Sequence, residues 1–147
     1  MGKVYNKILE FNRKYPGGIT FRTHKHAQVI EEYLNPDEEV LYAFCAQKNE
    51  KVSEIFNTFA IVLTSKRILL GHKRLLWGSF LYSVTPDLYN DMKIYKGLIW
   101  GKIEIDTVKE VITLTNLPST CLDEIETTIS EYMMVAKQKY KDEDKEI

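Results

Sequence analysis

The 147-residue chain has no long apolar run, contains only two cysteines and carries almost no net charge. A membrane-spanning helix needs about 20 consecutive apolar residues. The first residues have no apolar stretch behind Lys3, so they do not form a secretory signal. Cys45 and Cys121 both lie in apolar periodic segments, where buried free thiols are common. We therefore expect a cytoplasmic protein with reduced structural cysteines.

The formal charge of −1 conceals alternating charged blocks. Residues 1–26 carry +5, residues 27–56 carry −5, residues 57–76 carry +4, residues 77–136 carry −5, and residues 137–147 are neutral. A nearly neutral chain without a recognition motif is not expected to bind nucleic acid. The basic blocks can either neutralise acidic neighbours on the folded surface or dock on an anionic partner.

Apolar spacing predicts helices near both ends of the chain and strands between them. Helices are expected over residues 3–15 and about 24–34, the second with Thr23 as its N-cap, and from Thr120 to about residue 136. Strands are expected over residues 40–46, 56–64, 67–73, 75–85, 88–96, 102–107 and 111–117. Short connections make the strands antiparallel. The pattern predicts a mainly β (α+β) domain, a bent seven-stranded sheet capped by the C-terminal helix, with one or two N-terminal helices.

Several stretches and their order resemble the bacterial pleckstrin-homology (PH) domains, and among them the YokE-like group. These stretches are Glu38–Tyr42, Leu63–Leu70 (LTSKRILL) and Lys96–Ile103 (KGLIWGKI), followed by the C-terminal helix. The resemblance covers about residues 24–136 and implies a PH-like, partly open barrel with a leading helix. Residues 1–23 then form a basic arm with a short helix, and residues 137–147 form a charged, frayed tail.

No combination of residues predicts catalysis, a cofactor or a metal site. His24 and His26 lie two positions apart near a helix start, where their side chains point in different directions, and no third ligand is close in sequence. The chain has neither a phosphate-binding loop nor a dinucleotide fingerprint. Trp77 and Trp100 are expected in the core or in a groove. We therefore expect a non-enzymatic binding module without a cofactor.

Two surfaces are candidate binding sites. A peptide can add as an extra strand in a groove between the strand Tyr89–Lys96 and the C-terminal helix. The expected groove lining is Tyr89, Met92, Ile94, Ile125, Ile129 and Tyr132. The same edges could instead pair two copies of the chain in a homo-oligomer.

The alternative is peripheral contact with anionic membrane lipid through basic and apolar turns. The expected contacts are Lys66, Arg67, Lys73, Arg74 and Trp77. An inositol-phosphate pocket is not expected, because the loop at residues 47–54 balances two lysines with two glutamates.

Overall fold

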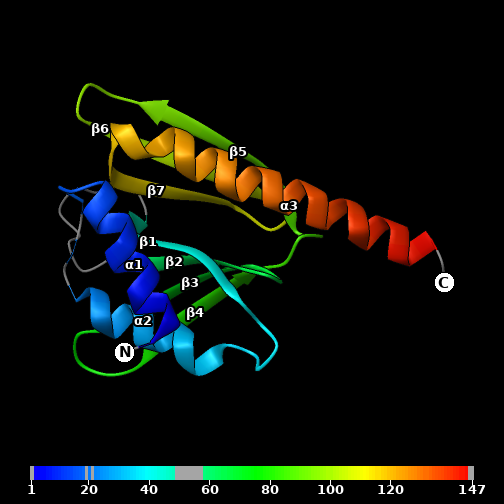
Figure 1. The fold of residues 1–147 in the computed structure, drawn as a ribbon, viewed down its shortest axis with the longest axis horizontal. Helices are drawn as coiled ribbons and strands as arrows, with labels where there is room; N and C mark the ends of the chain where they lie inside the picture. The colour runs from blue at the N-terminus through cyan, green and yellow to red at the C-terminus, as the bar shows by residue number, and fades with distance from the viewer. Residues whose placement is uncertain (1, 19, 21, 49–57, 146–147) are drawn as a thin grey trace.

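In the part of the chain that the structure describes, seven antiparallel strands form one sheet in the order β4-β3-β2-β1-β7-β6-β5, so β4 and β5 are its two edges. The computed structural model describes residues 2–18, 20, 22–48 and 58–145. Its elements are α1 (Lys3–Lys14), α2 (Thr23–Tyr33), β1 (Val40–Lys48), β2 (Thr58–Thr64), β3 (Ile68–Lys73), β4 (Ser79–Val84), β5 (Tyr89–Lys96), β6 (Trp100–Thr107), β7 (Val111–Pro118), a short 3₁₀ helix (Ser119–Cys121) and α3 (Leu122–Lys145) (Figure 1). The predicted sheet, its capping helix and both N-terminal helices are confirmed.

The sheet is bent because β1 belongs to both of its halves. Along most of its length β1 pairs with β2, and it meets β7 only through Gln47 and Lys48. The strands β1–β4 and β5–β7 therefore diverge, and α3 lies against the second half (Figure 1). The main core fills the space between them, with members that include Phe44, Ile61, Leu63, Ile103, Ile105, Ile125, Ile129 and Met133.

A second apolar cluster lies on the other face of the first half-sheet, under α1 and α2. It contains Val4, Ile8, Ala27, Ile30, Ala43, Cys45, Ala60, Val62 and Leu69. With both faces covered, β2 is buried at every position. Phe11 of α1 reaches around to the main core, where its ring lies 5.5 Å from that of Phe44. The segment predicted as a basic arm thus packs its helix against the sheet.

A glycine permits the close packing of α2 on β3. A Cβ atom on Gly71 would lie 2.5 Å from Cγ1 of Ile30. Real carbon atoms do not approach so closely without displacement, so the absence of a side chain lets the helix lie directly on the strand.

Three of the boundaries that differ from the predicted elements have a local physical reason. β4 begins at Ser79 rather than at residue 75, because Gly78 adopts a φ of 84° and closes a loop over residues 74–78. Thr23 is the first helical residue of α2 rather than its N-cap, and its hydroxyl donates to the carbonyl of Thr20. Helix α3 continues to Lys145, where a frayed tail was expected from residue 137, because its alternating lysines and acids are compatible with a solvated helix.

Candidate functional site

The edge strand β5 offers unpaired backbone. It pairs with β6 on one side, and in the described part of the chain no strand lies on its other side. The side chains of Asp91, Lys93 and Tyr95 are exposed on one face, while Met92 and Ile94 turn toward the core. A register shift between Tyr89 and Asp91 interrupts the start of the strand. The regular free edge therefore runs from Asp91 to Lys96.

The residues predicted to line a groove form the contact between β5 and α3 instead. Four of the six are buried in the main core: Tyr89, Met92, Ile125 and Ile129. Ile94 is partly buried against the same cluster. Tyr132 turns toward the other half-sheet and donates its hydroxyl to the carbonyl of Ser65 at 2.8 Å. A ligand at this edge would meet the backbone of β5 rather than the four buried side chains.

Polar contacts hold α3 beside both ends of β5. Near the start of the strand, Lys137 Nζ donates to the carbonyl of Tyr89 at 2.5 Å. Near its end, Lys96 Nζ lies 2.5 Å from Asp123 Oδ2. The helix is thus anchored over the inner face of β5, and the polar flank of α3 borders the free edge.

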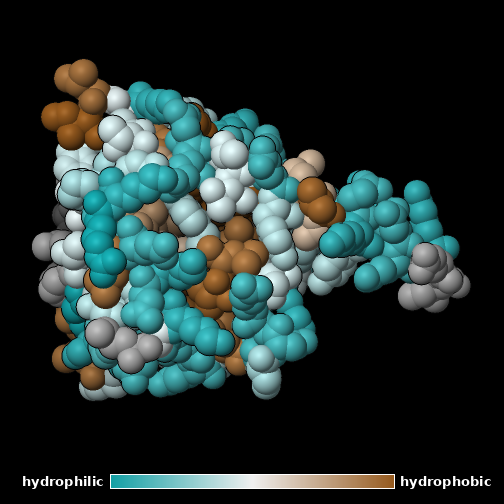
Figure 2. Space-filling view, viewed as in Figure 1, coloured by the Kyte–Doolittle hydropathy of each residue, from teal (hydrophilic) through white to brown (hydrophobic). Residues whose placement is uncertain are grey.

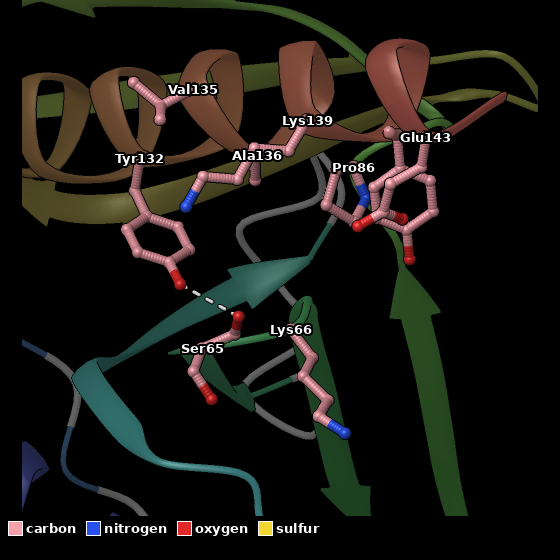
Figure 3. Close-up of a pocket in the computed structure, with 9 residues that line it drawn as sticks. Ser65, Lys66, Pro86, Tyr132, Val135, Ala136, Lys139 and Glu143 are labelled. Atoms are coloured by element: carbon pink, nitrogen blue, oxygen red, sulfur yellow. Dashed lines mark hydrogen bonds between the residues drawn. The ribbon is translucent and has the colours of Figure 1, made fainter. Parts of the chain in front are cut away.

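A cleft of about 510 Å³ lies between the second half of α3 and the first half-sheet. It is lined by Ser65, Lys66, Pro86, Tyr132, Val135, Ala136, Lys139, Tyr140 and Glu143 (Figure 3). The helix residues recur every three or four positions, so they share one face of α3. Sequence reasoning named only Lys66 and Tyr132 among these residues and placed them in different candidate sites, because the cleft depends on the β2–β3 turn lying opposite a helix some 70 residues away.

Two of the residues predicted to contact an anionic surface are engaged within the protein. Arg67 forms a two-pronged ion pair with Glu38, with Nε 2.9 Å from Oε2 and Nη2 3.1 Å from Oε1. The Glu38 side chain is fully buried. Lys66 is exposed and pairs with Asp37 at 2.6 Å. Arg67 is therefore unavailable to an external anion, and the charge of Lys66 is largely balanced.

The other predicted contacts lie together in the loop between β3 and β4. Lys73, Arg74 and Trp77 are all exposed there. Trp100, the first residue of β6 beside the β5–β6 turn, is also substantially exposed. Both tryptophans were expected in the core or in a groove, and neither is buried, because Trp77 occupies the β3–β4 turn and Trp100 the first position of β6, beyond the reach of the two apolar clusters.

The described thiols and histidines do not form a reactive site. Cys45 and Cys121 are free and lie in different apolar clusters, and burial raises the pKa of each thiol to about 12. Both thiols are therefore protonated at neutral pH and are poor nucleophiles.

The two neighbouring histidines have different environments. His24 is exposed beside the Tyr5 ring, whereas His26 is buried, accepts a hydrogen bond from the Lys73 backbone N–H and stacks on His72. Among the described residues, no group of three or more histidine, cysteine, aspartate or glutamate side chains could hold a metal ion. Within the same residues, no helix combines the length and apolarity needed to cross a membrane.

Comparison with known families agrees with this architecture. The family described as "Bacterial PH domain" matches residues 34–131, about two thirds of the chain. The chain belongs to the bacterial PH domain family. The match begins after α2 and ends within α3, so α1 and α2 lie outside it. PH-like folds support binding functions on a shared scaffold, and fold alone does not identify the ligand.

Solved structures share this PH-like fold at low sequence identity. A pleckstrin homology domain from Shewanella amazonensis SB2B is 14% identical, with a TM-score of 0.53, and the alignment covers 85% of this chain and 98% of that one. The C-terminal domain of an unknown protein from Leishmania infantum is 18% identical, with a TM-score of 0.50, covering 66% of this chain and 85% of that one. No curated protein matches the chain.

The loop at residues 47–54, where an inositol-phosphate pocket was not expected, lies mostly outside the described residues, which stop at Lys48 and resume at Thr58.

Proposed function

We propose that this PH domain is a non-enzymatic binding module that takes an extended segment of a partner protein along the free edge of β5. The observation that carries the proposal is the unpaired backbone from Asp91 to Lys96. Alternate residues of an edge strand direct their N–H and C=O groups outward, where another strand can pair with them. At about 3.3 Å per residue, this edge can hold roughly 17 Å of an extended peptide.

Two features favour β5 over the other edge strand, β4. β5 is the longer strand, with eight residues against six. It also has α3 beside it, whereas β4 borders the hairpin loop and contacts α2. An added strand would therefore find backbone partners on β5 and polar side chains such as Asp123 and Lys137 on the helix flank. Such a ligand is held mainly through its backbone, with limited dependence on its own sequence.

Nuclear magnetic resonance with selected peptides tests this proposal. Short peptides are selected from a random displayed library on the full chain and then added to the ¹⁵N-labelled protein. We expect the amide signals of β5 to shift and the outward amides to gain protection from hydrogen exchange. Peptides that perturb only cleft residues, such as Ser65 and Lys139, would reject strand addition and place the ligand site in the cleft instead.

Proline substitution at neighbouring positions provides an internal control. Of two successive residues in an edge strand, one directs its N–H to the paired strand and the other directs it outward. Lys93→Pro and Ile94→Pro should therefore differ in stability, and the better folded variant is the one whose outward N–H is removed. That variant should lose peptide binding. Sedimentation at several concentrations shows whether the same variant also abolishes self-association, in which case the occupant of the edge is a second copy.

A further inference from the structure

Two hairpin loops carry the same sequence pattern, Lys-x-Leu-(Leu or Ile)-Trp-Gly. Residues 73–78 run from the last residue of β3 through the turn to β4, and residues 96–101 run from the last residue of β5 through the turn into the start of β6. We call them the two tips. Their central apolar side chains face solvent: Leu76 is 85% exposed, Trp77 78%, Leu98 98% and Ile99 66%. Exposed large apolar residues are unremarkable when scattered singly, but here they are concentrated in two short turns that hold both tryptophans of the chain.

Both tips lie at the same end of the molecule. Within each half-sheet the strands are antiparallel, and the bend between the halves brings the β3–β4 and β5–β6 turns to the end away from the projecting part of α3 (Figure 1). The space-filling view shows hydrophobic side chains at the upper and lower corners of this end (Figure 2).

Hydrogen bonds anchor each tip to a neighbouring segment. Arg22 donates from its two terminal nitrogens to the carbonyls of Lys73 and Arg74, at 3.2 and 3.3 Å. The backbone N–H of Ser119 donates to the carbonyl of Ile99 at 2.9 Å.

One stretch of chain connects the two anchoring segments. Gly18 lies beside Pro118, which directly precedes Ser119, because a Cβ on that glycine would be 3.7 Å from the proline ring. The four-residue step from Gly18 to Arg22 can span at most about 14 Å. The tips are therefore held on one scaffold at a limited separation.

Hydrogen bonds pair the backbone at the base of each tip. The N–H of Arg74 donates to the carbonyl of Gly78 at 3.1 Å, and the N–H of Gly97 donates to the carbonyl of Trp100 at 3.0 Å. The Gly97 carbonyl accepts from the Ser119 hydroxyl at 2.8 Å. An unsatisfied peptide group is costly in an apolar medium, so the apex of each tip suits the hydrated headgroup region rather than the hydrocarbon core, while the paired base holds the turn in shape.

The charge around the first tip favours an anionic surface. Lys73 and Arg74 are exposed there. Lys25 is exposed on the first turn of α2, and that turn has no acidic residue. At the second tip, Lys96 is paired with Asp123. The first tip can therefore attract anionic headgroups, while the second contributes apolar contact without a large charge of its own.

We propose that the two tips insert together into the headgroup region of an anionic lipid bilayer and attach this PH domain to the membrane surface. Tryptophan and leucine at the apices, with flanking cations, are the residue types that favour the interface. Two separate protrusions also suit a fluid bilayer better than the continuous complementary surface of a protein partner. The attachment does not depend on peptide binding at β5, and it leaves the projecting half of α3 and its cleft directed away from the membrane.

The two tryptophans allow each tip to be followed separately. Trp77→Phe leaves Trp100 as the only tryptophan of the chain, and Trp100→Phe leaves Trp77. Each variant is mixed with vesicles of phosphatidylcholine containing about one third phosphatidylglycerol at low salt, with and without brominated acyl chains. We expect a blue shift of the emission in both variants, quenching by the brominated lipid in both, and release of the protein at high salt.

Substitutions in the first tip measure the apolar and the electrostatic contributions to vesicle binding. Leu76→Ser combined with Trp77→Ser should weaken partition onto the vesicles about tenfold or more. Replacing Lys73 and Arg74 by glutamine should weaken it about fivefold for each charge. The matched control is Met134→Ser with Val135→Ser, which removes exposed apolar side chains from α3 at the opposite end and should bind vesicles normally. Unchanged circular dichroism and thermal unfolding show that each variant remains folded.

Three results overturn the proposal. Absence of vesicle binding at low salt removes it entirely. Binding without quenching of either tryptophan reduces the contact to surface attraction, and quenching of one tryptophan alone shows that the tips do not insert together. None of these results bears on peptide binding at β5, which is measured without lipid.

Discussion

Loss of Arg67 should destabilise the fold by leaving a buried carboxylate without its cation. Glu38 is fully buried, and its two oxygens accept from Arg67, from the Thr64 hydroxyl at 2.5 Å and from the Asn35 backbone N–H at 3.1 Å. Breaking a buried ion pair by removing one partner typically costs about 3–5 kcal/mol. Because the Thr64 and Asn35 bonds survive in Arg67→Met, we expect a loss of about 3 kcal/mol, near the lower limit.

Urea unfolding at pH 7 measures this loss. With a denaturant slope of about 2 kcal/mol per molar for a domain of this size, the midpoint should fall by about 1.5 M. The double variant Glu38→Met/Arg67→Met removes both charges and should recover most of the stability, since apolar replacements of a buried pair are often neutral. A single-variant loss below about 1 kcal/mol, or a double variant no more stable than the single one, would refute this account of the pair.

The pH dependence gives an independent test. Burial raises the pKa of Glu38, but the hydrogen bonds from Arg67, Thr64 and Asn35 outweigh it and hold this pKa below its ordinary value of 4.5. In the wild type, the contribution of the ionised Glu38 to folding stability is therefore present above pH 4.5. It is lost as the pH falls through the lowered pKa of Glu38 in the folded state. In Arg67→Met, burial acts without the cation and raises the pKa of Glu38. The stability gap between wild type and variant should accordingly narrow as the pH is lowered from 7 toward 4.5.

Three further substitutions test the packing of the N-terminal helices. Phe11→Ala should lower the free energy of unfolding by about 3–4 kcal/mol in chemical denaturation, because its ring is buried in the main core; a loss typical of a surface residue would show that α1 is a detachable arm. Gly71→Ala should lower it by about 1–3 kcal/mol, because the new methyl meets Ile30, whereas Gly18→Ala places its methyl at an ordinary contact distance and serves as the control. Burial lowers the pKa of His26 to about 4, so unfolding should take up protons between that value and 6.5, and stability should rise with pH across this window. His26→Asn keeps a hydrogen-bond acceptor but cannot titrate, so its stability curve should be flatter there, and an unchanged slope would assign the titration to another group.

The sequence by itself determined the class of the fold and most of its elements. Period-2 alternation in segments such as Lys102–Thr107 and helical spacing after Thr120 reflect which side chains face the core, and this is a local property of the chain. The order of those segments was enough to indicate a PH-like sheet with a capping helix. The edge position of β5 depends on the pairing of β1 with β7, because hairpin connections alone would place β5 beside β4.

Tertiary structure decided which polar and apolar groups are available to a ligand. Arg67 reads as a surface cation in the sequence, yet a carboxylate 29 residues earlier in the chain binds it in the interior. Trp77 and Trp100 read as core or groove aromatics, yet Trp77 is exposed in the β3–β4 turn and Trp100 at the first position of β6. Residues predicted to line a groove, such as Met92 and Ile129, instead close the core. Burial and charge pairing depend on which distant segments contact one another, and local residue patterns do not specify these contacts.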